Sequence, residues 1–567
     1  MLAAVVPKDN PREKLRSRLV SQLYDFWQRF RTHPLSPPSV LFSSSAADLP
    51  ALTPPLPVPQ LSPTQPSGCQ RLVACADADL PTFVAEDAVA RRYLDLLSPL
   101  DWAHFPERPT NRPWPGKEPA PRAPYVAAYL LKLNEGLKSM GKLRAYLLEH
   151  PGLVWLLGFP LVPDANAKHG FDVERSVPLR RQFGRILRDL DNAAAQFLLT
   201  GTVHLIQQEL PPEITFGDVI SLDTKHIIAW VKENNPKAYV SERYDKTKQP
   251  KGDPDCKLGC KKRHNKGEGN GGEQATSDAS SSPSAPAAPA SPPAGPSTTP
   301  TTNPVPASQA SVGESYWGYA SGVVTTQVPE WGEIVLAELT QTFDKGDATY
   351  FFPLLAQTEQ RLGRKPRCGA LDKAYDAFYV YQYFHDAGGL AAVPLVAKGR
   401  HDVRTFSPDG LPVCAAGLAM PLKFAFTDRT TTIVVHERGK YVCPLIFPSK
   451  IADTCPANHD NWPKGGCTAM MPTSLAHASV TSLTARAPNT GARCAEVYKQ
   501  RTADERSNSQ AVDLGIERPH LRRGSAIVNQ NTLIYVLINL RALQRIRQHK
   551  EQLARPPKTP IPIRHLT

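Results

Sequence analysis

The feature that most constrains the fold is a low-complexity segment, residues 265–314, that lies between strand-like segments. Ser, Pro, Ala, Thr and Gly dominate it, and large apolar side chains are almost absent. Such a segment cannot offset its ordering entropy by burial, so we expect it to be disordered. The sequence on either side has the apolar content of a folded core, which predicts one α/β fold that this insert interrupts.

The segments around the insert predict a sheet with helices between its later strands. Apolar and β-branched runs predict strands at 216–224, 317–327, 334–342, 367–371 and 391–396. Helices are predicted at 347–363 and 377–388, the second ending at a pair of glycines. This order of three strands, helix, strand, helix and strand resembles that of a ribonuclease H-like mixed sheet, although the order alone does not select that fold.

Two acidic residues follow two of these strands. Asp223 comes at the end of the first strand, and Asp372 comes directly after the fourth. In open α/β sheets, ligands gather at the carboxyl ends of strands, so these carboxylates would converge if the two strands are neighbours. The alternative is a structural one, because an isolated Asp in such a position is more often a turn former or a helix cap. Asp376 is the better candidate to cap the following helix and is the rival for the second acid.

A third acid is expected from a later helix. Tyr498, Arg501 and Glu505 are spaced i, i+3 and i+7, which places them along one face if the segment is a single helix. Without the other two acids, Glu505 would be interpreted as a solvated surface residue of a charged helix.

Taken together, these residues resemble the DDE transposases of bacterial cut-and-paste insertion sequences, whose catalytic domain is ribonuclease H-like. The resemblance rests on FGDVISLDTKH around Asp223, on ALDKAYDAF around Asp372 and on VYKQRTADER around Glu505. The segment WGYASGVVTT is also similar to the second strand of that family. The similarity covers about residues 210–400 and 490–548. It departs from the family pattern at Val512, where a Lys is expected seven residues after the Glu.

The resemblance implies that Asp223, Asp372 and Glu505 are the catalytic residues and that they bind two Mg²⁺ or Mn²⁺ ions. Hard divalent cations prefer oxygen ligands, and a pair of them can activate the attacking oxygen and stabilise the leaving one. Water would first free a 3′-hydroxyl at the transposon end, and that hydroxyl would then attack target DNA. Tyr498 and Arg501 would position the scissile phosphate or the helix that carries the Glu. Further basic candidates for phosphate binding, in place of the missing Lys, are Arg506, Arg518, Arg522 and Arg523.

The expected partner is double-stranded DNA, both the terminal inverted repeats and the target. A homo-oligomer on DNA is expected because two ends must be brought together. Two alternatives remain open from the sequence. One is a transposase-derived DNA-binding protein without catalytic activity, which Val512 and the long insert would suit. The other is a ribonuclease H-like nuclease, which would not need the Tyr498–Arg501–Glu505 spacing.

The rest of the chain completes the expected organisation. We expect an N-terminal amphipathic helix (1–33), a Pro-rich linker (34–75) and a mainly helical domain that would bind DNA ends or serve as a plain helical bundle (76–210). The catalytic core would comprise 211–264 and 315–400. A β-rich insertion domain (401–490), closing helices with the third acid (491–550) and a flexible tail (551–567) would follow.

Net charge supports a polyanionic partner. The chain carries 66 Lys and Arg against 53 Asp and Glu, a formal net charge of +13. The excess is concentrated at 237–263, with nine basic against four acidic residues, and from 499 to the end, with 13 against five. Both stretches adjoin the expected catalytic residues, as phosphate neutralisation would require.

The patterns of cysteine and hydropathy further restrict the class of protein to which this chain can belong. The ten cysteines are irregularly spaced and include no CxxC pair, so unmetallated thiols are the preferred interpretation and a metal site built from distant cysteines is the alternative. No apolar run is long enough to span a membrane, and no signal peptide is evident at the start. The expected location is therefore the reducing cytoplasm of a bacterium, in association with the nucleoid.

Overall fold

The structure is a computed structural model that describes residues 71–72, 80–108, 120–261, 314–394, 405–407, 411–429, 435–458, 462–473 and 488–554. The expected N-terminal helix and nearly all of the linker and of the low-complexity insert lie outside these residues. The tail beyond residue 554 lies outside them as well. Among the described residues the chain is mixed α/β, with helices packed around a mixed sheet of parallel and antiparallel strands.

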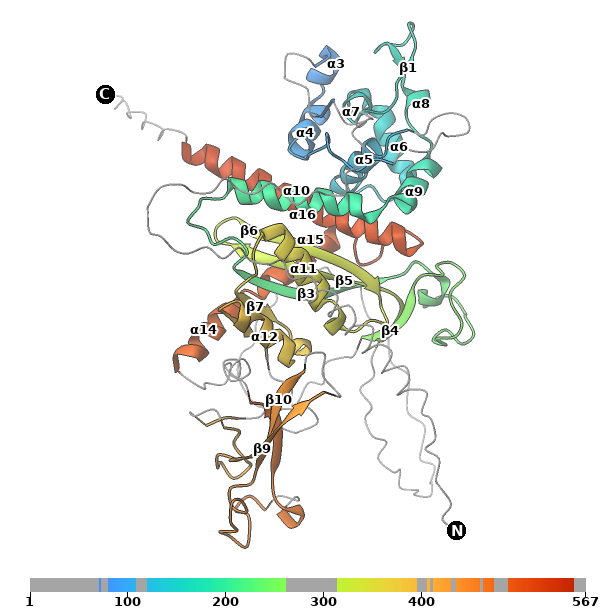
Figure 1. The fold of residues 1–567 in the computed structure, drawn as a ribbon. Helices are drawn as coiled ribbons and strands as arrows, with labels where there is room; N and C mark the ends of the chain where they lie inside the picture. The colour runs from blue at the N-terminus through green and yellow to red at the C-terminus, as the bar shows by residue number, and fades with distance from the viewer. Residues whose placement is uncertain are drawn as a thin grey trace, which may run out of the picture.

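Residues 82–209 form short helices and one small hairpin, drawn in blue to green in Figure 1. Polar side chains fix several helix starts; Asp87, for example, accepts hydrogen bonds from the backbone N–H groups of Val89 and Ala90. The helices are α3 (Thr82–Ala85), α4 (Ala88–Leu97), α5 (Ala123–Asn134), α6 (Met140–Glu149), α7 (Pro151–Leu156), α8 (Val173–Ser176), α9 (Arg180–Asp189) and α10 (Asn192–Glu209). The hairpin pairs β1 (Val162–Pro163) with β2 (Phe171–Asp172).

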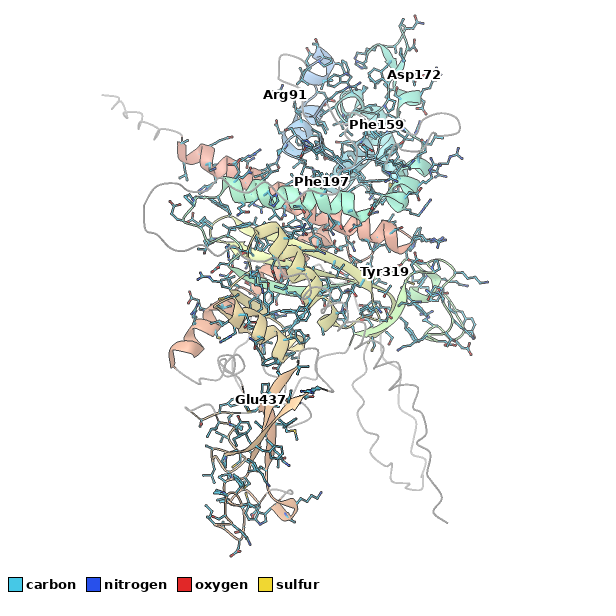
Figure 2. The ribbon with its side chains drawn as sticks, in the orientation of Figure 1. Arg91, Phe159, Asp172, Phe197, Tyr319 and Glu437 are labelled. Atoms are coloured by element: carbon cyan, nitrogen blue, oxygen red, sulfur yellow. The ribbon has the colours of Figure 1, made fainter. Side chains whose placement is uncertain are left out.

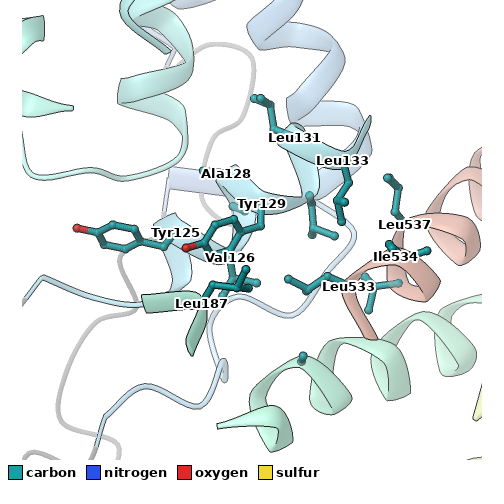
Figure 3. Close-up of a cluster of buried hydrophobic side chains, with 14 of the residues drawn as sticks. Tyr125, Val126, Ala128, Tyr129, Leu131, Leu133, Leu187, Leu533, Ile534 and Leu537 are labelled. Atoms are coloured by element: carbon teal, nitrogen blue, oxygen red, sulfur yellow. The ribbon is translucent and has the colours of Figure 1, made fainter. Parts of the chain in front are cut away.

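The helical region shares its core with the last helix of the chain. Helix α16 (Gly524–Ala554), the last of the closing helices expected within 491–550, lies beside α10 and ends four residues beyond that range. Figure 3 shows Tyr129 and Leu133 of α5 packed toward Leu533 and Leu537 of α16, and all four side chains are buried. The N-terminal helices are therefore attached to the closing helix by apolar burial, which is the main stabilising term in such a contact.

The central sheet has six strands. They are β3 (Val219–Ile228), β4 (Lys257–Lys261), β5 (Glu314–Val328), β6 (Gly332–Thr342), β7 (Cys368–Leu371) and β8 (Leu390–Ala392). The order is β4-β5-β3-β7-β8, and β6 also pairs with β5. The pairs β3–β5, β4–β5 and β5–β6 are antiparallel, whereas β3–β7 and β7–β8 are parallel. Strands that lie on opposite sides of the insert in the sequence thus pair directly in one sheet.

Helices cover both faces of this sheet. Helices α11 (Phe351–Leu362) and α12 (Phe378–Asp386) pack on the face to which Ile220, Leu222 and Ala320 contribute. The opposite face holds α14 (Pro488–Lys499), which packs on Cys368 and Ala370, and α15 (Thr502–Asp513). Helices α10 and α16 contact β6. Figure 1 shows α10 and α16 crossing the molecule between the sheet and the N-terminal helices.

A second, three-stranded antiparallel sheet lies within the expected β-rich insertion. Its order is β11 (Thr468–Pro472), β10 (His436–Val442) and β9 (Leu422–Asp428). It extends away from the central sheet, as the positions of Glu437 and Tyr319 show in Figure 2. After Val442, where β10 ends, the chain turns out of the sheet.

One expected helix cap is wrong. The N-cap of α12 is Ala377, which makes no side-chain cap hydrogen bond. The Asp376 carboxylate instead accepts a hydrogen bond from the Tyr381 hydroxyl at 2.7 Å. Asp372 is the residue that caps, since its side chain accepts from the Lys373 backbone N–H at the start of a short 3₁₀ turn, η4 (Lys373–Tyr375). Among the described residues, no helix has the length and apolar character to cross a bilayer.

Candidate active site

Asp223 and Asp372 stand side by side at the centre of the sheet. Strands β3 and β7 run parallel, and their last paired residues are Leu222 and Leu371. Asp223 and Asp372 are the next residue on each strand. Because side chains alternate between the two faces along a strand, both carboxylates face the side that α14 and α15 cover. The condition for convergence that the sequence left open is therefore met, because the two strands are adjacent.

Helix α15 brings Glu505 toward Asp223. Both side chains line one cavity of about 480 Å³. Three residues further along the helix, the Asn508 side-chain amide donates to Asp223 Oδ2 at 3.1 Å, which ties α15 to β3. Glu505 lies in the first turn of the helix, and 59% of its side chain is exposed. Asp372 is not among the residues that line this cavity, so the three acids converge on one region without forming a single closed cluster.

The i, i+3 and i+7 spacing suggested that Tyr498, Arg501 and Glu505 share one face of a single helix. In the structure that helix is interrupted. Helix α14 ends at Lys499 and α15 begins at Thr502. The Thr502 hydroxyl donates to the Lys499 carbonyl at 3.0 Å, a local hydrogen bond that competes with the helical pattern. Arg501 is therefore the N-cap residue of α15, located in the break between the two helices.

Arg501 is the electrostatic link among the three acids. Its guanidinium lies 3.6 Å from the Glu505 carboxylate. Burial lowers the pKa of Arg501, but the charges of Tyr498, Asp372, Asp223 and Glu505 outweigh burial and raise that pKa above its ordinary value. Its buried Nε has no hydrogen-bond partner in the described part of the chain. Arg501 is thus a permanently charged donor that faces the acidic site from the helix break.

Tyr498 packs into the contact between α14 and the sheet. Its partly buried ring packs against a small apolar cluster that includes Cys368, Leu390 and Cys494. The cluster joins α14 to the edge formed by β7 and β8. Tyr498 therefore packs the end of α14 against the sheet, just before the helix break that holds Arg501.

The acidic surroundings perturb the central carboxyl. Burial raises the pKa of Asp223 above its ordinary value, the Thr224 backbone N–H and Arg501 lower it, and the charges of Asp372 and Asp347 raise it. Asp347 was not selected from the sequence. It accepts a hydrogen bond from the Thr224 hydroxyl at 2.9 Å and so adds a further carboxylate beside the site. The excess negative charge is what a cationic ligand would relieve.

A buried acid lies beneath the site and was also missed. Asp504 is fully buried, and its Oδ1 accepts from the Thr325 hydroxyl at 2.6 Å. Burial, and secondly the charge of Asp223, raise the pKa of Asp504 well above its ordinary value. Asp504 precedes Glu505 in a polar helix, and no sequence signal separates a buried acid from an exposed one there.

The basic candidates are distributed differently from the expectation. Arg518 lines the cavity, together with Lys225 and Lys261, which had not been singled out. Arg506 forms an ion pair with the buried Glu333. The side chains of Arg522 and Arg523 are exposed outside the cavity lining. Arg522 lies over the ring of Trp230, 4.9 Å from its centroid.

Val512 occupies part of the cavity wall where the resemblance implied a lysine. Val512 also packs against the apolar core that α5 and α16 share, so its side chain contributes to the stability of the fold as well as to the cavity wall. The basic groups of the cavity come instead from β3, β4 and the loop after α15.

The donor set suits a hard divalent cation, because Asp223, Asp372 and Glu505 offer carboxylate oxygens. Within the described ranges, however, no three His, Cys, Asp or Glu side chains are arranged as a formed metal-binding group. For all three acids to hold one cation, Glu505, which is exposed and paired with Arg501, would have to turn toward the two aspartates.

No protein family, curated protein or solved structure matches this chain.

Proposed function

We propose that this protein is a DNA transposase with a ribonuclease H-like catalytic core. The strand order β6-β5-β3-β7-β8, with the first three strands antiparallel and the last two parallel to β3, supports this assignment. That order places the first and fourth strands of the core next to each other, as the chemistry requires.

The observation that carries the proposal is the meeting of Asp223, Asp372 and Glu505 around Arg501. These residues are separated by more than a hundred positions in the sequence, yet their charges all act on one guanidinium. A structural role for Asp223 would not explain an acidic, partly buried residue on a central strand that faces a polar cavity.

Each residue has a role that follows from its position. Arg501 would bind a non-bridging oxygen of the scissile phosphate, for which a guanidinium has suitable donor geometry. Asn508 would fix the rotamer of Asp223. Lys225, Lys261 and Arg518 would hold the neighbouring phosphates of the DNA strand.

Asp223, Asp372 and Glu505 would hold divalent ions, Mg²⁺ or Mn²⁺, which when bound stabilise charge on the phosphate and supply a nucleophile at neutral pH. In the first reaction the oxygen of water bonds to phosphorus and the bond to the 3′ oxygen breaks, leaving a 3′-hydroxyl. In the second, that hydroxyl bonds to a phosphorus of target DNA and displaces the 3′ oxygen there. Both are in-line displacements, so one arrangement of side chains serves for both.

A DNA-binding protein without catalysis is the second candidate. It is favoured by the absence of a formed metal-binding group among the described residues and by Val512 in the cavity wall. On this account the basic groups would bind DNA, and the three acids would serve only the fold.

The test uses labelled DNA that carries the inverted repeats flanking this reading frame, with Mg²⁺ or Mn²⁺. The proposal predicts nicking at the repeat end and joining to target DNA, and the Asp223→Asn variant should lose both while it still binds. Binding without nicking would support the second candidate. Nicking without joining would indicate a nuclease, and an Asp223→Asn variant that still cuts would refute the site assignment.

A further inference from the structure

The three-stranded sheet has a small apolar core for an independent element. In the part of it that the structure describes, the buried cluster consists of Met420, Tyr441, Ala469 and Met471. Other apolar side chains of the same region, including Phe424 and Met470, are exposed. Elements with so little buried apolar area usually need a disulfide, a metal or a partner for stability.

Two cysteines lie opposite each other at one end of this sheet. In the antiparallel pair β10–β11, the last paired residues are Val442 and Thr468. Cys443 directly follows Val442 and Cys467 directly precedes Thr468, so both lie just beyond this pair at the same end of the sheet. The backbone comes close at this point, since a Cβ built on Gly466 would lie 3.3 Å from the Cys443 sulfur. The strand register therefore places two thiols beside each other.

Two more cysteines reach the same end. Cys414 packs with Cys467 against the small apolar cluster, and the Ala415 backbone N–H donates a hydrogen bond to the Cys467 sulfur. Cys455 is almost fully buried, with 3% of its surface exposed. Burial raises the pKa of Cys467 most, and the charges of Cys414, Cys443 and Cys455 raise it further. The other three thiols therefore all lie near the Cys467 thiol.

Three of the four cysteines share the same local backbone. The N–H three residues after the cysteine donates to its carbonyl, from Gly417 to Cys414, from Ile446 to Cys443 and from Asn458 to Cys455. Gly417 and Asn458 have positive φ, at 76° and 44°. Such turns direct successive backbone N–H groups into a concave site that favours a negatively charged ligand atom, such as a thiolate.

We propose that Cys414, Cys443, Cys455 and Cys467 bind one structural zinc ion that stabilises the three-stranded sheet. Four thiolates are a complete tetrahedral ligand set for zinc, and soft sulfur ligands select it over the hard cations of the acidic site. Metal binding would supply the stability that the small core lacks. The proposal is independent of the transposase assignment, because none of these cysteines lies in the cavity that Asp223 and Glu505 line.

Binding requires the thiols to rotate inward. Among the described side chains, no three of the ligand-forming types already surround a single point. A cysteine has one side-chain torsion, so its sulfur can move toward a metal without displacement of the backbone that positions it. The competing arrangement is a disulfide between Cys443 and Cys467, which would use two of the four thiols.

The test measures zinc in the full-length protein purified without added metal, by mass spectrometry of the elements. We expect one zinc per chain, lost in Cys455→Ser and in Cys414→Ser and retained in the controls Cys260→Ser and Cys256→Ser. Replacement of zinc by Co²⁺ in the wild-type protein should give strong thiolate-to-cobalt charge-transfer bands. It should also give the visible absorption bands of a tetrahedral site with four sulfur ligands.

The cobalt spectrum keeps the proposal testable even if a cysteine variant fails to fold. Wild-type protein that contains no zinc and gives no thiolate-to-cobalt band would overturn the proposal. So would zinc content unchanged by Cys455→Ser, or two thiols that react only after reduction, which would identify the disulfide.

Discussion

The side-chain amide of Asn508 donates to Asp223 Oδ2 at 3.1 Å, and this contact joins helix α15 to the central strand β3. It sets the orientation of the carboxylate that lies next to Asp372 and places Glu505, one turn earlier on the same helix, at the shared cavity. An Asn in a polar helix has therefore become part of the acidic site.

Replacement of Asn508 by Ala should reduce DNA-end cleavage by roughly 10- to 100-fold, the usual cost of losing a residue that orients a metal ligand. DNA affinity should change little, because Asn508 carries no charge. Single-turnover cleavage and a binding titration would separate the two effects. Gln510→Ala, on the same helix, is the control. Equal loss in both variants would show that the effect is a general disturbance of α15.

Removal of the basic groups of the cavity should weaken DNA binding without sequence preference. For Lys261→Ala and Arg518→Ala, the slope of log affinity against log salt should fall by about one for each lost phosphate contact. Lys365→Ala removes a charge that lies over the ring of Tyr383 in the α11–α12 region and should leave the slope unchanged. A slope that is the same in all three variants would exclude this cavity as the DNA-binding surface.

The buried Glu338 should make stability depend on pH. Its carboxylate accepts hydrogen bonds from the Thr340 and Thr532 hydroxyls, but burial outweighs them and raises its pKa above the ordinary 4.5. The folded state therefore holds the proton more tightly than the unfolded state. The stability that this contributes is complete below about pH 4.5 and is lost as pH rises toward the raised pKa.

Glu338→Gln removes that titration. We expect the unfolding free energy of the wild type, relative to this variant, to fall as pH rises above about 4.5. Urea denaturation at a series of pH values measures the difference. A difference that stays constant with pH, or that grows, would contradict a raised pKa for Glu338 in the folded state.

Gly318 is required by the close approach of β5 to β3. A Cβ at this position would lie 2.0 Å from the Ile227 carbonyl oxygen, so Gly318→Ala must displace backbone. We expect a loss of roughly 1–3 kcal/mol in unfolding free energy, the usual range for a destabilising substitution. Gly346→Ala is the matched control, because a Cβ there meets no atom within 4 Å. Similar thermal stability for the two variants would argue against the β3–β5 register.

Five of the six strands of the central sheet were predicted because each carries a local apolar signal, whereas β4 (Lys257–Lys261), which is rich in Lys and Gly, was not. The β-branched run before Asp223 and the short apolar run that ends at Leu371 mark two strands, and only the tertiary pairing had to be assumed. The break at Arg501 could not be predicted from the i, i+3 and i+7 spacing. It depends on the hydrogen bond from the Thr502 hydroxyl to Lys499, which competes with the helix.

Other features depend on contacts between distant segments. Asp504 and Glu505 are adjacent acids in one helix, yet one is buried against Thr325 and the other is largely exposed. The cysteine cluster lacks the close spacing that identifies a metal site in a sequence, and the register of β10 and β11 is what brings Cys443 and Cys467 together. Asp347 was also missed, because its place beside the site depends on its contact with Thr224, which is distant in the sequence.

The most direct test of the central claim is anomalous diffraction from crystals of the protein with Mn²⁺ and DNA that carries the inverted repeat. The account predicts manganese bound by Asp223 and Asp372, with the Glu505 carboxylate moved from Arg501 to the metal. Manganese that is absent from this site, or bound there while Glu505 stays paired with Arg501, would contradict the three-acid assignment.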